Sequence, residues 1–232
     1  MAAQPSMLII GRAAKAPCPY GPLSSNVRPQ MAKAPLLWPS AKTPQPEVAA
    51  IKDLNAHLIG LEYSAKAWEA GLLLYETAKQ PPASISRDVA SRWRFIACNE
   101  CVLELYHLRA RLAKIQSVQL RKCPSLLAWV DMTKVRGARK RLDDNFPGIE
   151  ALRHATAHKG ENEAHPEVHA PDGQFALTGL REPDVFSALY EGKLYRLAIT
   201  GQTLEQIDQV LQEFLAGFAR AAAELEMQGH LD

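Results

Sequence analysis

The sequence predicts a mainly all-α fold, an up-and-down bundle of four to five helices with a small β-hairpin inserted before the last helix. Three observations support this prediction. Apolar residues recur at steps of three and four over long stretches, which is the period of a helix with one buried face. Breaks that contain proline or glycine separate these stretches. Two short strand-like segments, 185–190 and 193–200, flank a Glu191-Gly192 turn that suits a hairpin.

The helical period defines four long segments and one short segment. We expect the long helices at residues 47–79, from Ser84 or Ser86 to 119, at 125–145 and at 203–227. A capping box at residues 203–206 (Thr-Leu-Glu-Gln) should start the last of them. The short helix should begin at Pro147, whose missing N–H costs nothing in a first turn, and should end at Gly160 as its C-cap. Residues 175–177 are a candidate third strand.

Residues 1–46 differ in composition from the rest of the chain, which we interpret as one helical domain, 47–232, with the β insertion at about 174–200. The first 46 residues hold nine prolines and several cationic residues but no acidic residue. Such a segment buries too little apolar surface to fold, so we expect disorder. The same composition is typical of a transit peptide, and a translation start at Met31 is an equal alternative. We assign this extension no function.

The composition argues against export and against a membrane anchor. The sequence has no run of about eighteen apolar residues, and its longest early apolar patch, residues 7–10, is too short for a signal peptide. Four cysteines in 232 residues do not make a disulfide framework. We therefore expect a cytoplasmic protein with no membrane contact. Cys98 and Cys101 form a C-x-x-C within a predicted helix, and we interpret them as core residues rather than a metal or redox site.

One guanidinium and two imidazoles lie within six residues, at Arg153, His154 and His158. Arginine provides a permanent forked cation that fits phosphate oxygens. Histidine exchanges a proton near neutral pH, as general acid–base catalysis requires. Together these groups could cleave a phosphodiester without a metal ion. The structural alternative is a polar helix end with solvent-facing side chains, because short motifs often match by chance.

The order of these residues resembles the motif of the HEPN superfamily, in which an arginine and a polar residue precede a histidine after four to six positions. HEPN domains are helical and include RNases of toxin–antitoxin, abortive-infection and RNA-guided defence systems. The resemblance implies a homodimer that joins two motifs in one cleft, a 2′,3′-cyclic phosphate product and no cofactor. It also implies that His158 is the acid–base, that Arg153 stabilises the charged phosphorane, and that His154 orients Arg153 or contacts phosphate.

Arg153 and His158 are five positions apart, which corresponds to about 140° around an ideal helix. The two side chains can therefore converge only if the helix end is distorted or if they act across a dimer. A run of cations one helix earlier is the candidate guide for an RNA backbone. It consists of Lys134, Arg136, Arg139, Lys140 and Arg141. The usual meaning of such a run is a solvated helix face.

Two other interpretations of the histidine-rich region stay open. One is a metal site, because His154 and His158 have the spacing of metal ligands and further candidate ligands follow. These are Glu161, Glu163, His165 and His169. Ala155 stands where a zincin has its catalytic glutamate, which argues against that chemistry. The other interpretation is a non-catalytic helical dimer that acts as an interaction module, for example with a nucleotidyltransferase-type antitoxin. The slightly acidic body of the chain favours it.

Overall fold

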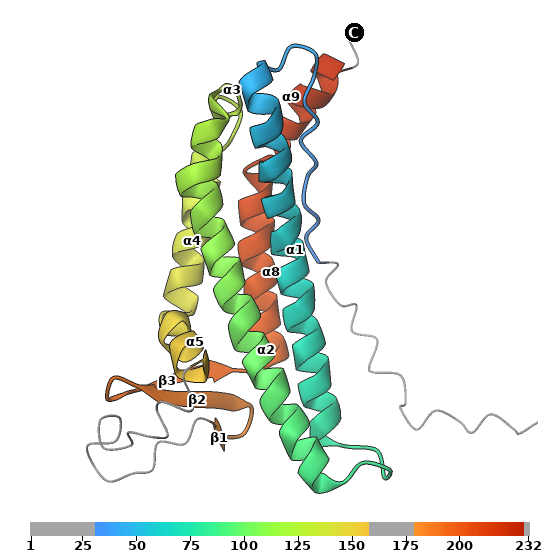
Figure 1. Cartoon of the computed structure of the whole chain (residues 1–232), viewed down its shortest axis with the longest axis vertical. Coiled ribbons are helices and arrows are strands. Elements are labelled where there is room, and N and C mark those ends of the chain that lie inside the picture. Colours follow the sequence, from blue (N-terminus) through green and yellow to red (C-terminus); the bar gives the residue numbers. More distant parts are fainter. Residues whose placement is uncertain (1–30, 158–178, 230–232) are drawn as a thin grey trace, which may run out of the picture. The chain divides into compact units, whose positions relative to one another are not determined.

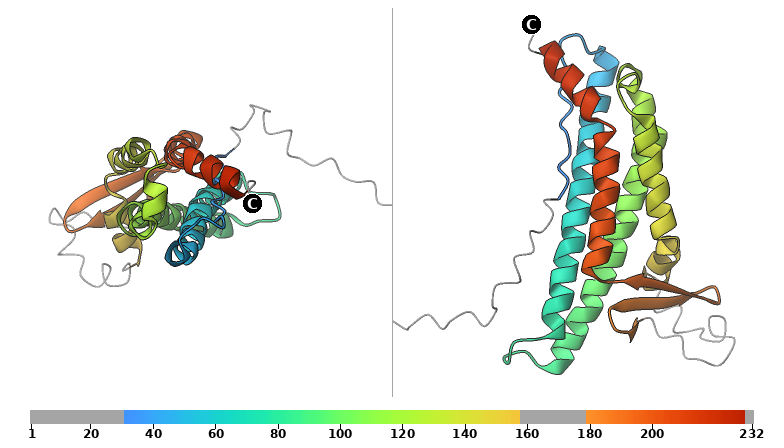
Figure 2. Two further views of the ribbon diagram at one scale, coloured as in Figure 1. Left: turned by 90° about the horizontal axis from the view of Figure 1, so that it is seen from above. Right: turned by 180° about the vertical axis from the view of Figure 1, so that it is seen from behind.

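The computed structural model describes residues 31–157 and 179–229, and within these residues the chain is mainly helical, as predicted (Figure 1). The long helices are α1 (Gln45–Lys79), α2 (Arg87–Lys114), α4 (Met132–Asn145) and α8 (Gly201–Ala216). They alternate in direction and lie side by side in all three views (Figure 1, Figure 2). The predicted helical bundle is therefore confirmed. None of the described helices is both long enough and apolar enough to cross a membrane.

Shorter helical pieces connect and extend the bundle. They are η1 (Ile115–Gln119), a π-helical turn, η2 (Leu120–Lys122), a 3₁₀ turn, α3 (Pro124–Leu127), α5 (Ile149–Ala157) and α9 (Ala219–Gly229). The predicted second helix thus begins after Ser86, whose side chain accepts a hydrogen bond from the Val89 N–H, and changes its winding after Lys114. The short helix α5 begins at Ile149, two residues later than predicted.

Two helices that we predicted as continuous are each broken in two. The third helix breaks between α3 and α4, where the Asp131 side chain accepts hydrogen bonds from the N–H groups of Thr133 and Lys134 and so starts a new helix. The last helix breaks between α8 and α9 at Gly217. The two breaks meet, because the Asp131 N–H donates to the Gly217 carbonyl at 2.9 Å. Local sequence does not encode this contact between distant segments.

The predicted capping box of the last helix is also displaced. Thr200, not Thr203, is the N-cap of α8, and its side chain accepts from the Thr203 N–H. The Thr203 hydroxyl instead donates to the Ala198 carbonyl at 2.8 Å, which ties the start of α8 to the preceding strand. The helix therefore begins immediately where the sheet ends.

The β insertion is an antiparallel sheet of three strands in the order β1 (Gly179–Glu182), β2 (Val185–Tyr190) and β3 (Lys193–Ala198). The predicted hairpin is confirmed: Tyr190 pairs with Lys193, and both turn residues, Glu191 and Gly192, have positive φ angles, as a type I′ turn requires. The third strand is β1, whereas the predicted third strand, 175–177, lies outside the described residues. The sheet lies against α5, to which both β2 and β3 contribute contacts (Figure 1).

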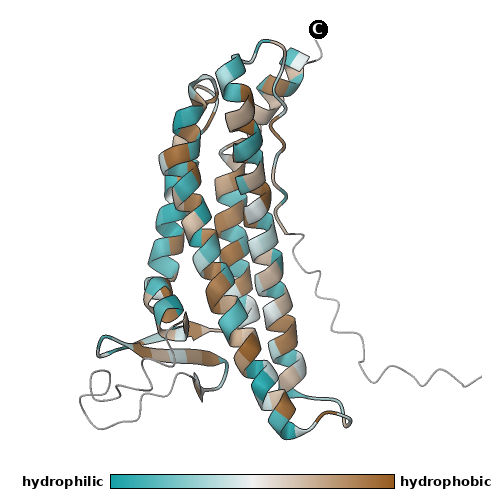
Figure 3. Ribbon diagram, in the orientation of Figure 1, coloured by the Kyte–Doolittle hydropathy of each residue, from teal (hydrophilic) through white to brown (hydrophobic). Residues whose placement is uncertain are grey.

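One continuous apolar core joins the bundle to the sheet. Hydrophobic and hydrophilic residues alternate along each bundle helix, as expected for helices with one buried face (Figure 3). Cys98 and Cys101 are fully buried in this core, which confirms their interpretation as core residues. Burial raises the pKa of the Cys98 thiol to about 12, so this thiol stays protonated and unreactive at neutral pH.

Residues 31–44 differ from the disorder that we expected, because they run as an extended segment along the bundle (Figure 2). Leu37 is fully buried in the core. Its N–H donates to the Asn55 Oδ1 at 2.9 Å, and its carbonyl accepts from the Asn55 Nδ2 at 2.7 Å. The Ala32 N–H donates to Asp208 of α8 at 3.0 Å. A bidentate amide on α1 thus satisfies the backbone of a segment whose composition predicts no structure.

Truncation of the buried leucine should measure how firmly this segment is held. We expect Leu37→Ala to lower the free energy of unfolding by about 2–5 kcal/mol, because it opens a cavity in a packed core. The adjacent Trp38 is 66% exposed, so Trp38→Ala should change the free energy of unfolding little. Urea denaturation of both variants checks this, and equal effects of the two substitutions would show that residues 31–44 do not pack as described.

An ion pair fastens the sheet to the end of α1. Asp184 occupies the turn between β1 and β2 with a φ of 60°, and its Oδ1 lies 2.8 Å from the Lys79 Nζ. The hydrogen bond from Lys79 lowers the pKa of Asp184, and the same bond raises the pKa of Lys79. Burial, followed by the neighbouring Asp184 carboxylate, raises the pKa of Tyr75 to about 12. The pair therefore stabilises the fold only while Asp184 is ionised.

Because the pKa of Asp184 is lower in the folded state, its contribution is complete above the unfolded-state pKa and is lost as the pH falls through the folded-state pKa. We expect Asp184→Asn, which tolerates the positive φ, to lower the free energy of unfolding at neutral pH by up to about 1 kcal/mol. At about pH 2 the variant and the parent should be equally stable. Asp88→Asn breaks an exposed ion pair with Arg92 and is the control. Urea titrations at both pH values test this, and a difference that persists in acid would contradict it.

Candidate functional site

Helix α5 presents the Arg153–His154 pair, and its buried face fixes where these side chains point. Ile149, Leu152 and Ala155 are buried in the core, so one side of the helix is anchored along its full length. The helix can start close to the sheet because Gly148 has no side chain: a Cβ there would lie 2.6 Å from the Tyr195 ring. Arg153 and His154 lie beside the buried face and are both half-buried.

The Arg153 guanidinium rests on an aromatic ring from another helix. Its Cζ lies 5.3 Å from the centroid of the Tyr106 ring of α2, within the range of a cation–π contact. Among the described residues, no carboxylate forms an ion pair with Arg153. A ring holds the guanidinium in place without cancelling its charge, so the N–H groups that do not face the ring can still bind an anion.

The His154 ring stacks on Tyr190 of β2, with the ring centroids 5.7 Å apart and the planes 20° from parallel. His154 and Arg153 are therefore held by tyrosines from two different elements, a strand and a helix. The two consecutive side chains therefore face different neighbours, Arg153 toward α2 and His154 toward the sheet. Neither tyrosine was a predicted site residue: Tyr106 fitted the apolar stripe of its helix and Tyr190 fitted a strand, so the sequence contains no signal for these contacts.

Arg109 is a structural arginine next to this site. Its Nε lies 2.7 Å from the Asp143 Oδ1 of α4, and its NH1 lies 3.0 Å from the Glu150 Oε2 of α5. The hydrogen bond that Arg109 donates to Asp143 makes the largest contribution to raising the pKa of Arg109. The guanidinium thus joins α2, α4 and α5, which places the motif helix on the bundle. Because its two partners come from other helices, spacing along α2 could not identify it.

The structure places two of the three predicted catalytic residues. Arg153 and His154 lie on α5, whereas His158 lies outside the described residues, so their mutual geometry stays a prediction. The further ligands of the alternative metal site, residues 161, 163, 165 and 169, also lie outside. Within residues 31–157 and 179–229, no three histidine, cysteine or acidic side chains are grouped so that they could hold a metal ion.

The predicted RNA-guiding cations lie on α4, and most are paired with acidic residues. Lys134 lies 3.7 Å from Asp131, and Lys140 lies 4.0 Å from Asp144. The pairs of the two arginines are Arg139 with Asp143 at 3.9 Å and Arg141 with Glu213 at 3.1 Å. Arg136 is exposed and forms no ion pair within the described part of the chain. This pattern is closer to a solvated, charge-balanced helix face than to a strongly positive groove.

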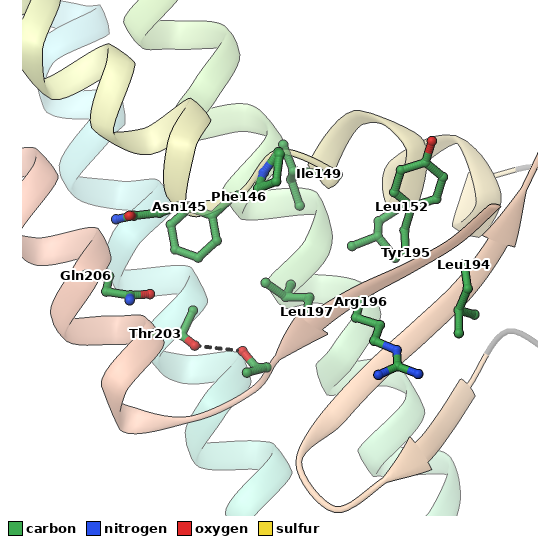
Figure 4. Close-up of a pocket in the computed structure, with 13 residues that line it drawn as sticks. Asn145, Phe146, Ile149, Leu152, Leu194, Tyr195, Arg196, Leu197, Thr203 and Gln206 are labelled. Carbon is green, nitrogen blue, oxygen red and sulfur yellow. Dashed lines mark hydrogen bonds between the residues drawn. The ribbon is translucent and has the colours of Figure 1, made fainter.

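A pocket of about 370 Å³ lies beside α5, between the α4–α5 turn, β3 and the first turn of α8 (Figure 4). Its lining is largely apolar, with Phe146, Ile149 and Leu152 on one side. Its polar groups include Asn145 and Gln206, but no histidine, cysteine or carboxylate among the described residues lines it. Arg153 and His154 do not line it either. The pocket is therefore separate from the motif, and its ionisable side chains are Tyr195 and Arg196.

Comparison of the chain with family models, with curated proteins and with solved structures finds no match. The described arrangement holds one uncompensated guanidinium and one imidazole at the junction of α2, α5 and the sheet. These groups can bind an anion, and they directly precede His158.

Proposed function

We propose that the protein is a metal-independent endoribonuclease of the HEPN type, acting in a toxin–antitoxin or phage-defence setting. One observation supports this most: Arg153 is held by a tyrosine ring and has no acidic partner among the described residues. Arg109 of α2, by contrast, pairs with two carboxylates, Asp143 of α4 and Glu150 of α5. A structural arginine would be expected to resemble Arg109, whereas an arginine that binds a phosphate must keep its charge available.

The proposed chemistry transfers a phosphoryl group within the RNA. His158 removes the proton of the ribose 2′-hydroxyl, the 2′-oxygen attacks phosphorus, and the bond to the 5′-oxygen of the next nucleotide breaks. The leaving oxygen takes a proton from an imidazolium, which gives a 2′,3′-cyclic phosphate and a 5′-hydroxyl. Arg153 stabilises the additional negative charge on the pentacoordinate phosphorane. In a homodimer, the second copy's motif can supply the opposite proton transfer. His154, stacked on Tyr190, orients this site or contacts the neighbouring phosphate.

Cleavage of single-stranded RNA by the purified full chain tests this proposal. We expect His158→Ala to lower the rate by about 10²–10⁴-fold and Arg153→Ala by about 10²–10³-fold, because they remove the acid–base and the charge stabilisation. A chelator should leave the rate of the parent unchanged, and mass spectrometry should detect a terminal 2′,3′-cyclic phosphate. Arg92→Ala, which removes an exposed arginine of α2 far along the helix from Tyr106, is the control and should cleave as the parent does.

Retention of full cleavage by His158→Ala would exclude this chemistry. A parent protein that leaves RNA intact, while circular dichroism shows it folded, would also exclude it. Loss of cleavage on chelation, with activity restored by added metal, would instead support the metal-site alternative.

A non-catalytic homodimeric interaction module is the second candidate, because α2 exposes a line of apolar side chains. Val89, Ile96 and Leu103 are seven residues apart, and Ile96 is 55% exposed. Side chains at a seven-residue spacing drift by only about 20° per step, so these three form one stripe that a partner helix can cover. The stripe fits the same helix of a second copy, and a dimer of this kind could form with or without RNA cleavage.

Analytical sedimentation of the purified chain measures its oligomeric state and so tests this second candidate. We expect the parent to be a dimer and Ile96→Asp to be a monomer, because a charge in the covered stripe costs several kcal/mol to desolvate. Leu73→Asp places the same charge at an exposed leucine of α1 and should leave the dimer intact. A monomeric parent, or equal dissociation of both variants, would exclude the α2 stripe as the interface.

A further inference from the structure

A second pocket, of about 250 Å³, opens between α1 and α2 and is lined almost entirely by basic side chains. Its lining consists of His57 from α1 and of His107, Ala110, Arg111 and Lys114 from α2. None of these residues belongs to the Arg153–His158 motif. The four basic residues come from two helices that pack along their length, so the pocket is formed only in the folded bundle.

The position of Arg111 depends on a glycine. The Arg111 side chain lies across Gly60 of α1, and a Cβ at position 60 would collide with NH1 and lie 2.9 Å from Cζ. Gly60 is buried, and the absence of its side chain makes the space that the guanidinium occupies. The planar cation is therefore held against the backbone of α1 instead of extending into solvent. A cation fixed in this way loses less conformational freedom when it binds a ligand.

The pocket has an excess of positive charge. Within the described residues, Arg111 and Lys114 form no ion pair, and Lys122 of η2 adds a third cation nearby. The acidic residues in the vicinity are Asp53, which only partly opposes the lowering of the His57 pKa, and Glu104, whose Oε1 lies 3.4 Å from the His107 Nδ1. Burial, then Lys114 and Arg111, lower the pKa of His57. His57 is thus a neutral hydrogen-bonding group at neutral pH, surrounded by cations that an anion would compensate.

We propose that this pocket binds a phosphate group. Arg111 offers a forked donor that matches phosphate oxygens, Lys114 adds a mobile ammonium group, and the two imidazoles provide further polar contacts. The bound phosphate belongs either to a small phosphorylated molecule or to a nucleic-acid backbone, since both present the same oxygens. The centroid of the His107 ring lies 6.0 Å from that of the Tyr106 ring, which supports Arg153. The binding proposal does not depend on RNA cleavage.

Two probes distinguish the sources of the phosphate. Inorganic pyrophosphate represents a small phosphorylated ligand, and a twelve-residue oligothymidylate represents a backbone that cannot be cleaved because it has no 2′-hydroxyl. Nuclear magnetic resonance of the histidine side chains follows each titration at the pocket itself. We expect a bound probe to shift the His57 and His107 signals and to raise the pKa of His57, because the bound anion offsets the charges of Arg111, Lys114 and Lys122.

Variants then connect the signal to the pocket. We expect Lys114→Ala and Arg111→Ala each to weaken binding by about ten-fold to a hundred-fold, the loss typical of one charge-assisted contact. Gly60→Ala should weaken it similarly by displacing Arg111. Arg139→Ala removes an arginine of α4 and Arg153→Ala removes the motif arginine, and both should keep the affinity of this pocket for pyrophosphate. Thermal melting establishes that each variant is folded, and the exposed Lys114 provides a test that does not disturb packing.

The two probes give different results for the two sources of the phosphate. Binding of pyrophosphate alone assigns the pocket to a small phosphorylated ligand, and binding of the oligonucleotide in competition with pyrophosphate assigns it to a nucleic-acid backbone. If neither probe shifts His57, or if Arg153→Ala abolishes the shift while Lys114→Ala does not, the proposal is overturned. Loss of RNA cleavage in His158→Ala with unchanged pyrophosphate binding would show that the two sites act separately.

Discussion

Packing of α5 against α2 and the sheet is the constraint on which the candidate site depends. The helix has only nine residues, and a helix this short is unstable in water without tertiary contacts. Its three core residues, together with the Glu150–Arg109 ion pair, determine its position and its rotation. The directions of Arg153 and His154 follow from that rotation. A loss of packing under α5 would therefore disturb the site without changing any of its functional groups.

Differences among arginines of similar sequence context carry much of the functional information. Arg109 and Arg111 are two residues apart on α2. Arg109 pairs with two carboxylates, whereas Arg111 lies on the backbone at Gly60 beside Lys114. Arg153, held by a tyrosine ring, resembles Arg111 in keeping its charge available. Net charge and the density of basic residues along the chain do not show which arginines have an acidic partner, because the partners come from other helices. Within the described part of the chain, four of the five cations in the conspicuous basic run on α4 have an acidic partner, whereas Arg111, Lys114 and Arg153 form no ion pair.

Comparison of the two broken helices shows where prediction from local pattern reaches its limit. The apolar period continues across residues 128–131 and across Gly217, so a pattern-based prediction joins the segments. The chain breaks because Asp131 caps the next helix and its N–H finds the Gly217 carbonyl of a segment 86 residues later. Residues 31–44 are a similar case. Their proline content predicts disorder, but a single buried leucine and the bidentate amide of Asn55 hold them on the bundle.

The amino-acid sequence by itself determined the helical class, a serine N-cap at Ser84 or Ser86, the Glu191-Gly192 hairpin turn and the buried state of Cys98 and Cys101. These features depend on period, capping and backbone preference, which act over a few neighbouring residues. Only the tertiary structure decided which of the described cations have an acidic partner and which rings contact Arg153 and His154. It also decided that a basic pocket forms where the Arg111 side chain lies across Gly60. Such features require contacts between helices that are distant in the chain, and one-dimensional spacing does not record them.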